Sequence, residues 1–421
     1  MVRTAYALPC SAYGCSAITI LSISARRRSG QDDDRVPAQS PPVEITVIED
    51  LEALRARCDE WNALAERACT GTIFQTYEWN LSWWRTLADG ARPLLLVAQA
   101  GGKMLGIAPL IMVEQRILGR RRRVVEFLGR GAADYSDFIV EPARGDVATL
   151  LLGWLARNAG RWDLLHLVNI AETSLLPELL PQAFAPGRFS TQVQRLYECP
   201  TRMLGDRDAD LRVACGRRFR ARFKRISQRG ALEFRRFADA GEMHAALEGL
   251  FRQHAQRWTG TGRQGFFFDE NQRAFYREMV RLLAPRGWVL FSALVSAGVP
   301  IALHFGFEHR GRMYYVKPTH DPAFAEYSPG KLHIGLTLQH ALERGARELD
   351  FTIGEEPYKY EFANRARINY AARVHGPALF YGLDRVLASA KAAVKRSPAA
   401  LQLARVLAKP FAPTLHRLGL L

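Results

Sequence analysis

The sequence has no apolar stretch as long as the roughly 18 to 20 residues that a membrane-spanning helix needs. The most apolar segment near the start, residues 16–24, follows a single basic residue and precedes three arginines in place of a cleavage site. We therefore expect residues 1–42 to be a disordered leader, with a mis-set start codon and a secretory signal as the alternatives. Consecutive aspartates and a group of prolines in this segment favour disorder.

Cysteine is scarce and scattered. The sequence has no CxxC pair and no histidines at the spacing of a zinc site, and its six cysteines are Cys10, Cys15, Cys58, Cys69, Cys199 and Cys215. This distribution predicts a protein of the reducing cytoplasm that has no structural metal.

Acidic residues are outnumbered. Against 58 Lys and Arg there are 42 Asp and Glu, which gives a net charge of +16 over 421 residues. The excess indicates an anionic ligand, a membrane surface or nucleic acid as the partner, and charge alone does not choose among them. The hydrophobic content of 48% is enough for large cores, and this chain length favours two domains.

Hydrophobic periodicity predicts the same order of elements twice. In the first half we expect a strand, an amphipathic helix, an aromatic helix, paired strands around Gly101-Gly102, and a further strand, helix and strand. In the second half the order recurs, and the segment from Ala98 aligns with the segment from Leu294. The fold class is therefore α/β (α+β), with two tandem domains of mixed, mainly antiparallel sheets flanked by helices, at residues 43–200 and 201–376.

The aromatic helix holds four large rings, at Tyr77, Trp79, Trp83 and Trp84. Rings at this spacing either line a substrate cleft or fill the core, and we favour the core.

Two basic segments stand out. Residues 215–230, on a predicted helix that begins near Asp208, carry six arginines and a lysine with no acid. They form either a solvated helix surface or an edge that binds phosphates or a polyanion. Residues 377–421 form a basic amphipathic helical tail that either packs on the second domain or lies on an anionic membrane surface, and we favour the membrane for its last part.

We expect the active site in the segment 312–362. Its residue pattern predicts a strand, an irregular loop, a helix and a second strand in that order. Ser328 is a suitable N-cap and Pro329 a suitable first helical residue. Gly330 and Lys331 then leave free backbone N–H groups and a cation at the positive end of the helix, which suits a phosphate. Ligands of open α/β sheets bind at such strand ends.

The motifs DPAFAEYSPGKL and ELDFTIGEEPYKYEF resemble the BioF2-like acetyltransferase family. The strands PIALHFGFEHRGRMYYV and the helix RRFRARFKRISQRG extend the resemblance over most of residues 43–385. This family is a branch of the GNAT superfamily that includes proteins called cellulose-biosynthesis protein CelD, and it is related to the FemAB aminoacyl-transfer fold.

The resemblance implies two GNAT-like domains and transfer of an acyl group from acyl-CoA to an amine or hydroxyl acceptor. Acetyl-CoA or another acyl-CoA would be a co-substrate, with no permanently bound cofactor and no metal. The family names imply a role in exopolysaccharide or cell-envelope metabolism. We expect a small-molecule or saccharide acceptor, no nucleic acid, and a cytoplasmic location with the inner-membrane surface as an alternative.

A GNAT site holds the donor diphosphate on N–H groups at a helix start and polarises the thioester carbonyl with a strand N–H. The diphosphate cradle would map to Ser328, Gly330, Lys331 and Leu332, and the polarising strand to Tyr315, Val316 and Lys317. The usual Gln/Arg-x-x-Gly-x-Gly/Ala loop of the superfamily is replaced here by the segment 327–331.

Direct attack on a thioester needs a base for the acceptor and an acid for the leaving thiolate. The candidate bases are Asp321, Glu326, Glu355 and Glu356, and the candidate acid is Tyr358. The alternative for the segment 355–359 is a solvated turn.

Several other polar residues have two interpretations. His304 and His320 are weaker candidate bases, and a histidine inside a strand, as at His304, is more often structural. Asp350 is more suited to orienting a neighbour than to chemistry. The expected contacts with the acceptor are His254, Arg257, Trp258 and Lys359, although Trp258 suits the core equally well.

Two rival functions remain at this stage. One keeps the fold and takes an aminoacyl-tRNA donor, with the arginines of residues 217–229 on RNA phosphates; the absence of a long coiled-coil insertion argues against it. The other is a non-catalytic accessory protein of polysaccharide assembly.

Overall fold

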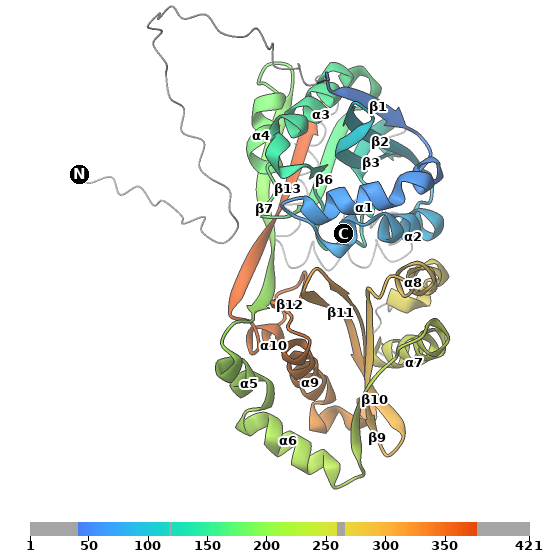
Figure 1. Cartoon of the computed structure of the whole chain (residues 1–421). Helices are drawn as coiled ribbons and strands as arrows, with labels where there is room; N and C mark the ends of the chain where they lie inside the picture. The colour runs from blue at the N-terminus through green and yellow to red at the C-terminus, as the bar shows by residue number, and fades with distance from the viewer. Residues whose placement is uncertain (1–40, 118–119, 259–265, 377–421) are drawn as a thin grey trace, which may run out of the picture. The chain divides into compact units, whose positions relative to one another are not determined.

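The computed structural model describes residues 41–117, 120–258 and 266–376 (Figure 1). The expected tail at 377–421 and nearly all of the expected leader at 1–42 lie outside these ranges. None of the helices within the described ranges is long and apolar enough to cross a bilayer.

The first half begins with a strand, two helices and an antiparallel group of strands. Its elements are β1 (Glu44–Ile48), α1 (Cys58–Arg67), α2 (Tyr77–Leu87), β2 (Ala91–Ala100), β3 (Lys103–Ile117), β4 (Arg120–Phe127), β5 (Ile139–Val140), α3 (Gly145–Arg157), β6 (Leu164–Ile170), α4 (Leu176–Ala183) and β7 (Ser190–Met203). The predicted hairpin is confirmed: Gly101 and Gly102 join β2 to β3 with φ angles of 56° and 79°, the left-handed pair that a tight two-residue turn requires.

The second half repeats this order after two additional helices. Its elements are α5 (Arg207–Cys215), α6 (Arg217–Ser227), β8 (Leu232–Arg236), α7 (Ala240–Trp258), α8 (Glu270–Leu283), β9 (Val289–Ser296), β10 (Val299–His309), β11 (Arg312–His320), α9 (Pro329–Glu343), β12 (Glu348–Asp350), α10 (Pro357–Tyr360) and β13 (Arg365–His375). Each half also has one parallel pair across a helical connection, β4 with β6 and β11 with β12. The predicted fold class, α/β with a mixed, mainly antiparallel sheet flanked by helices and a repeated order of elements, is therefore confirmed, but the strands of the two halves form one sheet.

The two halves exchange their last strands, which the sequence did not predict. β13 comes from the end of the described chain and lies between β6 and β7, while β7 pairs with both β13 and β12 (Figure 1). One 13-stranded sheet results. Neither β7 nor β13 reads as an apolar strand, because most of their side chains are exposed or half-buried.

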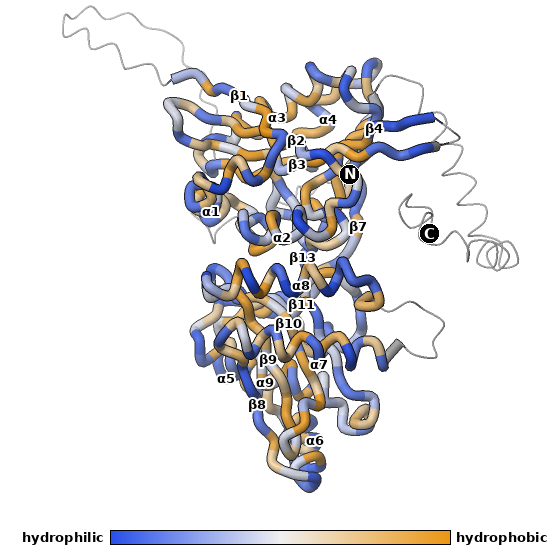
Figure 2. The backbone as a smooth tube through the Cα atoms, turned by 90° about the vertical axis from the view of Figure 1, so that its right-hand side faces the viewer, coloured by the Kyte–Doolittle hydropathy of each residue, from blue (hydrophilic) through white to orange (hydrophobic). Residues whose placement is uncertain are grey.

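The aromatic helix α2 belongs to the core. Tyr77, Trp79 and Trp83 are each at most 3% exposed, which confirms the core interpretation. Trp79 meets the Phe275 ring of α8 edge-on, with 5.6 Å between the ring centres. In Figure 2, which is coloured by hydropathy, apolar residues gather along strands such as β9, whose side chains are all buried.

Two predicted elements are corrected. The basic helix expected from Asp208 is two helices, α5 and α6, and the break is at Gly216, where a Cβ would lie 2.4 Å from the carbonyl oxygen of Arg212. The strand expected over residues 348–353 ends at Asp350, because Thr352 has a φ of 56° and leaves the extended conformation.

Candidate functional site

Two neighbouring strands diverge in the middle of the second half. β11 pairs with β12 in parallel only from Arg312 to Tyr314, yet β11 continues to His320. β12 ends at Asp350, and the left-handed residue Thr352 then turns the chain away. Beyond Tyr314, the edge of β11 that faced β12 is therefore left without a strand partner in the described part of the chain.

A cavity of about 250 Å³ opens at this divergence. Its walls come from β11, from the loop after it, from the first turn of α9 and from α10, and the lining residues are Tyr315, Pro318, Thr319, His320, Ala325, Ser328, Pro329, Gly330, Lys331, Ile334 and Tyr358. We call it the thioester cavity. Six residues that the sequence assigned to the site thus share one cavity: Tyr315, Ser328, Gly330, Lys331, Tyr358 and the weaker candidate base His320.

The start of α9 differs from the prediction. Ser328 has a left-handed backbone, with φ 52°, and its side chain makes no capping hydrogen bond. The Ser328 N–H donates to the carbonyl oxygen of Ala325, and the N–H groups of Lys331 and Leu332 donate to the carbonyl oxygen of Ser328 at 3.0 and 3.3 Å. The expectation that the Lys331 N–H is free is therefore wrong, and the N–H groups of Ser328 and Leu332, the other members of the expected cradle beside Gly330, also have acceptors. Among the described residues, the Gly330 N–H has no acceptor.

The cation of this helix start is paired. Lys331 Nζ lies 2.5 Å from Glu361 Oε1, and both side chains are partly exposed. Such an exposed pair contributes little to stability, so an incoming anion can compete with Glu361 for the ammonium group.

One wall of the thioester cavity rests on a buried stack of rings. The His304 and Tyr315 rings are parallel within 9° and 4.1 Å apart, and Tyr315 Oη lies 3.2 Å from His333 Nδ1. Burial lowers the pKa of His304 well below its usual value and lowers that of His333 to about 3. Both rings are neutral at pH 7, and the placement of His304 beneath Tyr315 fits the structural interpretation.

The predicted carboxylate bases lie outside the thioester cavity lining. An Asp321 carboxylate oxygen accepts the N–H of Ala323 at 2.9 Å and caps the short 3-10 helix Pro322–Tyr327. Glu326 is exposed and pairs with Arg225. Glu356 Oε2 lies 3.0 Å from Lys359 Nζ, which also donates to the carbonyl oxygen of Ile353 at 2.7 Å.

The remaining predicted residues are dispersed. His254 is buried on α7, its ring 5.0 Å from that of Phe267. Arg257 and Trp258 fall on the last turn of α7. Val316 and Lys317 continue β11 beyond its pairing with β12.

A polar group from the first half was missed. The Asp134 carboxylate lies close enough to Lys317 and Lys359 for their charges to act on it, and the Thr352 side chain hydrogen-bonds to it. Burial raises the pKa of Asp134 to about 6, whereas burial lowers the pKa of Lys317. Lys317 Nζ also lies 3.8 Å above the Phe266 ring. No local pattern marks Asp134, because its partners are remote in the sequence.

Asp350 is buried at the end of β12 and fits the orienting role expected of it. Its carboxylate accepts hydrogen bonds from Tyr135 Oη at 2.9 Å, from the Thr352 N–H at 2.8 Å and from Arg367 at 3.1 Å. Burial raises its pKa to about 6. Tyr135 belongs to the first half, so this carboxylate ties the two halves together beside the divergence of the strands.

The first half provides an internal comparison. At the start of α3, which corresponds to α9, the cavity holds only about 40 Å³ and is lined by Asp137 and Glu141 among others. The counterpart in the second half is about six times larger and contains Lys331 and no carboxylate. Only the second half therefore has the room and the charge for an anionic donor at this helix start.

No group of three or more histidines, cysteines, aspartates and glutamates within residues 41–117, 120–258 and 266–376 is placed to hold a metal ion.

Comparison with known proteins agrees with this geometry. The family model "Acetyltransferase (GNAT) domain" matches residues 214–360. A crystal structure of FemX is similar with a TM-score of 0.54 and 11% identity, over 78% of this chain and 96% of that chain. At such an identity the likeness concerns the fold alone.

Two further structures are similar at lower scores. A conserved protein of unknown function from Bacteroides thetaiotaomicron gives a TM-score of 0.47 and 13% identity, over 78% of this chain and 99% of that chain. L-PGS from Bacillus licheniformis gives a TM-score of 0.44 and 13% identity, over 75% of this chain and 90% of that chain. No curated protein matches the sequence. The similarity to this family therefore lies in the second half of the chain, at residues 214–360, the part that also lines the thioester cavity.

Proposed function

We propose that the protein is an acyltransferase that moves an acyl group from acyl-CoA to the amine or hydroxyl of a small-molecule or saccharide acceptor. The observation that carries this proposal is the thioester cavity, which opens where β11 and β12 diverge and reaches the first turn of α9. A donor that is anionic at one end and apolar along its arm suits such a cavity.

The donor is held by two kinds of contact. The Gly330 N–H and Lys331 Nζ receive the diphosphate, because one is an unused donor at a positive helix end and the other is a cation on the cavity wall. The apolar side chains of Pro318, Ala325 and Ile334 line the path of the pantetheine arm. This set is smaller than the four-residue cradle expected from the sequence.

The thioester carbonyl lies against the edge of β11 beyond Tyr314. A strand N–H on that edge donates to the carbonyl oxygen and stabilises the negative charge that develops on it. The acceptor nitrogen or oxygen attacks the carbonyl carbon, the C–S bond breaks, and the thiolate takes a proton. Tyr358 of α10, which also lines the cavity, is the proposed proton donor.

The acceptor enters from the side of Asp134 and Lys317. With a pKa near 6, Asp134 is largely ionised at pH 7 and still basic enough to take a proton from an acceptor ammonium. Glu356 remains the second proposed base. It forms an ion pair with Lys359, and the charge of Lys359 also acts on Asp134, so the two carboxylates share one cation. The structure offers Asp321 and Glu326 no place on the cavity wall, so the proposal does not depend on them.

An aminoacyl-tRNA donor is the first rival, and the arginines of α6 are the observation that supports it. Exposed arginines cover α6, and an aminoacyl-tRNA donor would use such a surface. A non-catalytic accessory role is the other rival. A function in exopolysaccharide or cell-envelope metabolism and a cytoplasmic location rest on the resemblance to CelD-type proteins. Contact with the inner membrane rests on the tail outside the described residues.

Thermal unfolding with and without ligand tests the donor. A ligand that binds only the folded protein at 100 times its Kd adds about 2.7 kcal/mol to the free energy of unfolding. We expect CoA, acetyl-CoA or a longer acyl-CoA to raise the Tm, and labelled acyl groups to reach an amine or hydroxyl acceptor. Stabilisation by aminoacyl-tRNA alone would favour the rival donor, and no stabilisation together with no transfer would favour the accessory role.

A further inference from the structure

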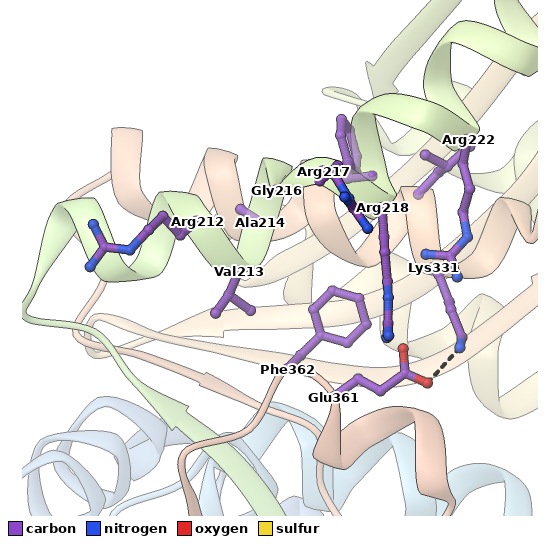
Figure 3. Close-up of a pocket in the computed structure, with 12 residues that line it drawn as sticks. Arg212, Val213, Ala214, Gly216, Arg217, Arg218, Arg222, Lys331, Glu361 and Phe362 are labelled. Atoms are coloured by element: carbon purple, nitrogen blue, oxygen red, sulfur yellow. Dashed lines mark hydrogen bonds and ion pairs between the residues drawn. The ribbon is translucent and has the colours of Figure 1, made fainter.

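A second cavity, of about 350 Å³, lies on the other side of Lys331, between the junction of α5 and α6 and the first turn of α9 (Figure 3). We call it the arginine cavity. Its lining contains five cationic side chains and one carboxylate, Glu361; the cations are Arg212, Arg217, Arg218, Arg222 and Lys331. None of its arginines lines the thioester cavity, and Lys331 lines both.

Two arginines extend toward the Lys331–Glu361 pair. Figure 3 shows the side chains of Arg218 and Arg222 running from α6 toward this pair, whereas Arg212 points away from it. Within the described residues, no carboxylate forms an ion pair with Arg218 or Arg222. Cations that outnumber their counter-charges repel one another, and a bound anion would relieve that repulsion.

The C-terminal part of the same face of α6 contacts the protein. Arg225 pairs with Glu326, and the guanidinium groups of Arg225 and of Arg229, which follows the helix, lie 4.7 and 5.3 Å from the centre of the Tyr327 ring. Arg218 and Arg222 lie earlier on this face, at i, i+4 spacing, and have no such carboxylate partner among the described residues.

The walls of the arginine cavity are held by close packing. At Gly335 of α9, a Cβ would lie 2.5 Å from the carbonyl oxygen of Ala214 and 2.7 Å from the Phe219 ring, so the two helical segments touch backbone to backbone. α5 is fixed in turn by a buried ion pair, Arg202 to Asp210, at 2.8 Å. The cavity is formed before a ligand arrives, which reduces the cost of binding.

We propose that the arginine cavity binds the phosphorylated nucleoside end of the acyl donor, with the 3′-phosphate of CoA between Arg218, Arg222 and Lys331. This inference rests on the proposed function, because it continues the donor from its diphosphate at Gly330 and Lys331. A phosphate monoester carries close to two charges, and arginine's planar fork matches its oxygens. The cavity is bounded by Glu361 and Phe362, which suits a single terminal phosphate better than a continuous polynucleotide backbone.

The test compares CoA with 3′-dephospho-CoA by isothermal titration calorimetry on the full chain at low salt. The wild type should bind CoA about 5- to 20-fold more tightly, as one or two charge contacts near a protein surface allow. In the double variant R218Q/R222Q the two ligands should bind within about twofold of each other. The matched control is R220Q/K224Q, which also removes two positive charges, from exposed positions of α6 outside the cavity lining, and should keep the wild-type preference.

A second variant gives a change of opposite sign, which misfolding cannot imitate. Glu361→Gln removes the carboxylate that competes for Lys331, so it should tighten CoA severalfold. Equal binding of CoA and 3′-dephospho-CoA by the wild type, or a preference that survives R218Q/R222Q, would overturn the inference and leave the proposed function standing. Binding of neither nucleotide would overturn both. Binding of tRNA alone, weakened by R218Q/R222Q, would assign the cavity to a polynucleotide and overturn the inference.

Discussion

Replacing Gly330 by glutamate places a carboxylate where the donor diphosphate is proposed to lie. The structure accepts the side chain, because the nearest heavy atom to a Cβ at this position is His320 Nδ1, at 3.9 Å, an ordinary contact. The backbone at Gly330 is helical, so the substitution introduces no strain there. We expect the Tm to stay the same or rise slightly, since a glycine in a helix is replaced.

The loss of donor affinity follows from Coulomb's law. A carboxylate about 6 Å from a diphosphate with two charges is repelled by about 1.4 kcal/mol at a dielectric constant of 80 and by about 5.5 kcal/mol at 20. An intermediate value of about 3 kcal/mol corresponds to a loss of roughly 100-fold in affinity for CoA. The variant also loses part of the helix-end attraction for anions, which acts in the same direction.

Calorimetric titration with CoA measures this effect, and Gly330→Gln is the matched control because it has the same size without the charge. Glutamate should weaken CoA binding about 10-fold or more relative to glutamine, and added salt should narrow the difference. Equal affinity in the glutamate variant and the wild type would refute the placement of the diphosphate. An equal loss in the glutamine variant would show that bulk alone, and no charge, is at work.

Three further predictions concern the acid, a buried carboxylate and a helix contact. Tyr358→Phe should lower kcat about 100-fold and leave KM within about twofold, because it removes only the proton donor. For Asp137→Asn, the free energy of unfolding relative to the wild type should rise by about 2 to 3 kcal/mol from pH 4 to pH 7. Burial raises the pKa of Asp137 to about 6, so the wild type loses stability as pH rises to that value. Gly335→Ala should destabilise the protein by about 2 kcal/mol in denaturant unfolding, because its Cβ meets the carbonyl oxygen of Ala214 at 2.5 Å.

Each of these predictions has an opposing outcome. An unchanged kcat in Tyr358→Phe would assign the proton to another group. A pH-independent difference between Asp137→Asn and the wild type would show that Asp137 titrates normally in the folded protein. Wild-type stability in Gly335→Ala would mean that α9 and the α5–α6 junction can separate without cost.

The tandem arrangement could be predicted from the sequence because each element carries its own local signal. The glycine pair at Gly101-Gly102 specifies its hairpin, and the apolar strand around Leu294 is continuous and fully buried, so its pattern is strong. The exchange of β7 and β13 could not be predicted, since their side chains are mostly polar and their pairing is fixed by distant partners.

Some of the residues that the sequence selected for the site line one cavity, and the local geometry of the helix start differs from the expectation. The sequence Ser328-Pro329-Gly330 predicts the start of a helix, and these three residues line a cavity in the structure. The Lys331 N–H was expected to be free and is not, because Ser328 adopts a left-handed backbone and its carbonyl oxygen accepts hydrogen bonds from the N–H groups of Lys331 and Leu332. Asp134 was missed for a different reason: only the folded chain brings it to Lys317 and Lys359.

A crystal structure of the protein with CoA tests the central claim most directly. The account predicts the pantetheine arm between β11 and α10, its sulfur near Tyr358, and the diphosphate against the Gly330 N–H and Lys331 Nζ. CoA bound elsewhere on the chain, with the thioester cavity closed or filled by protein, would contradict it.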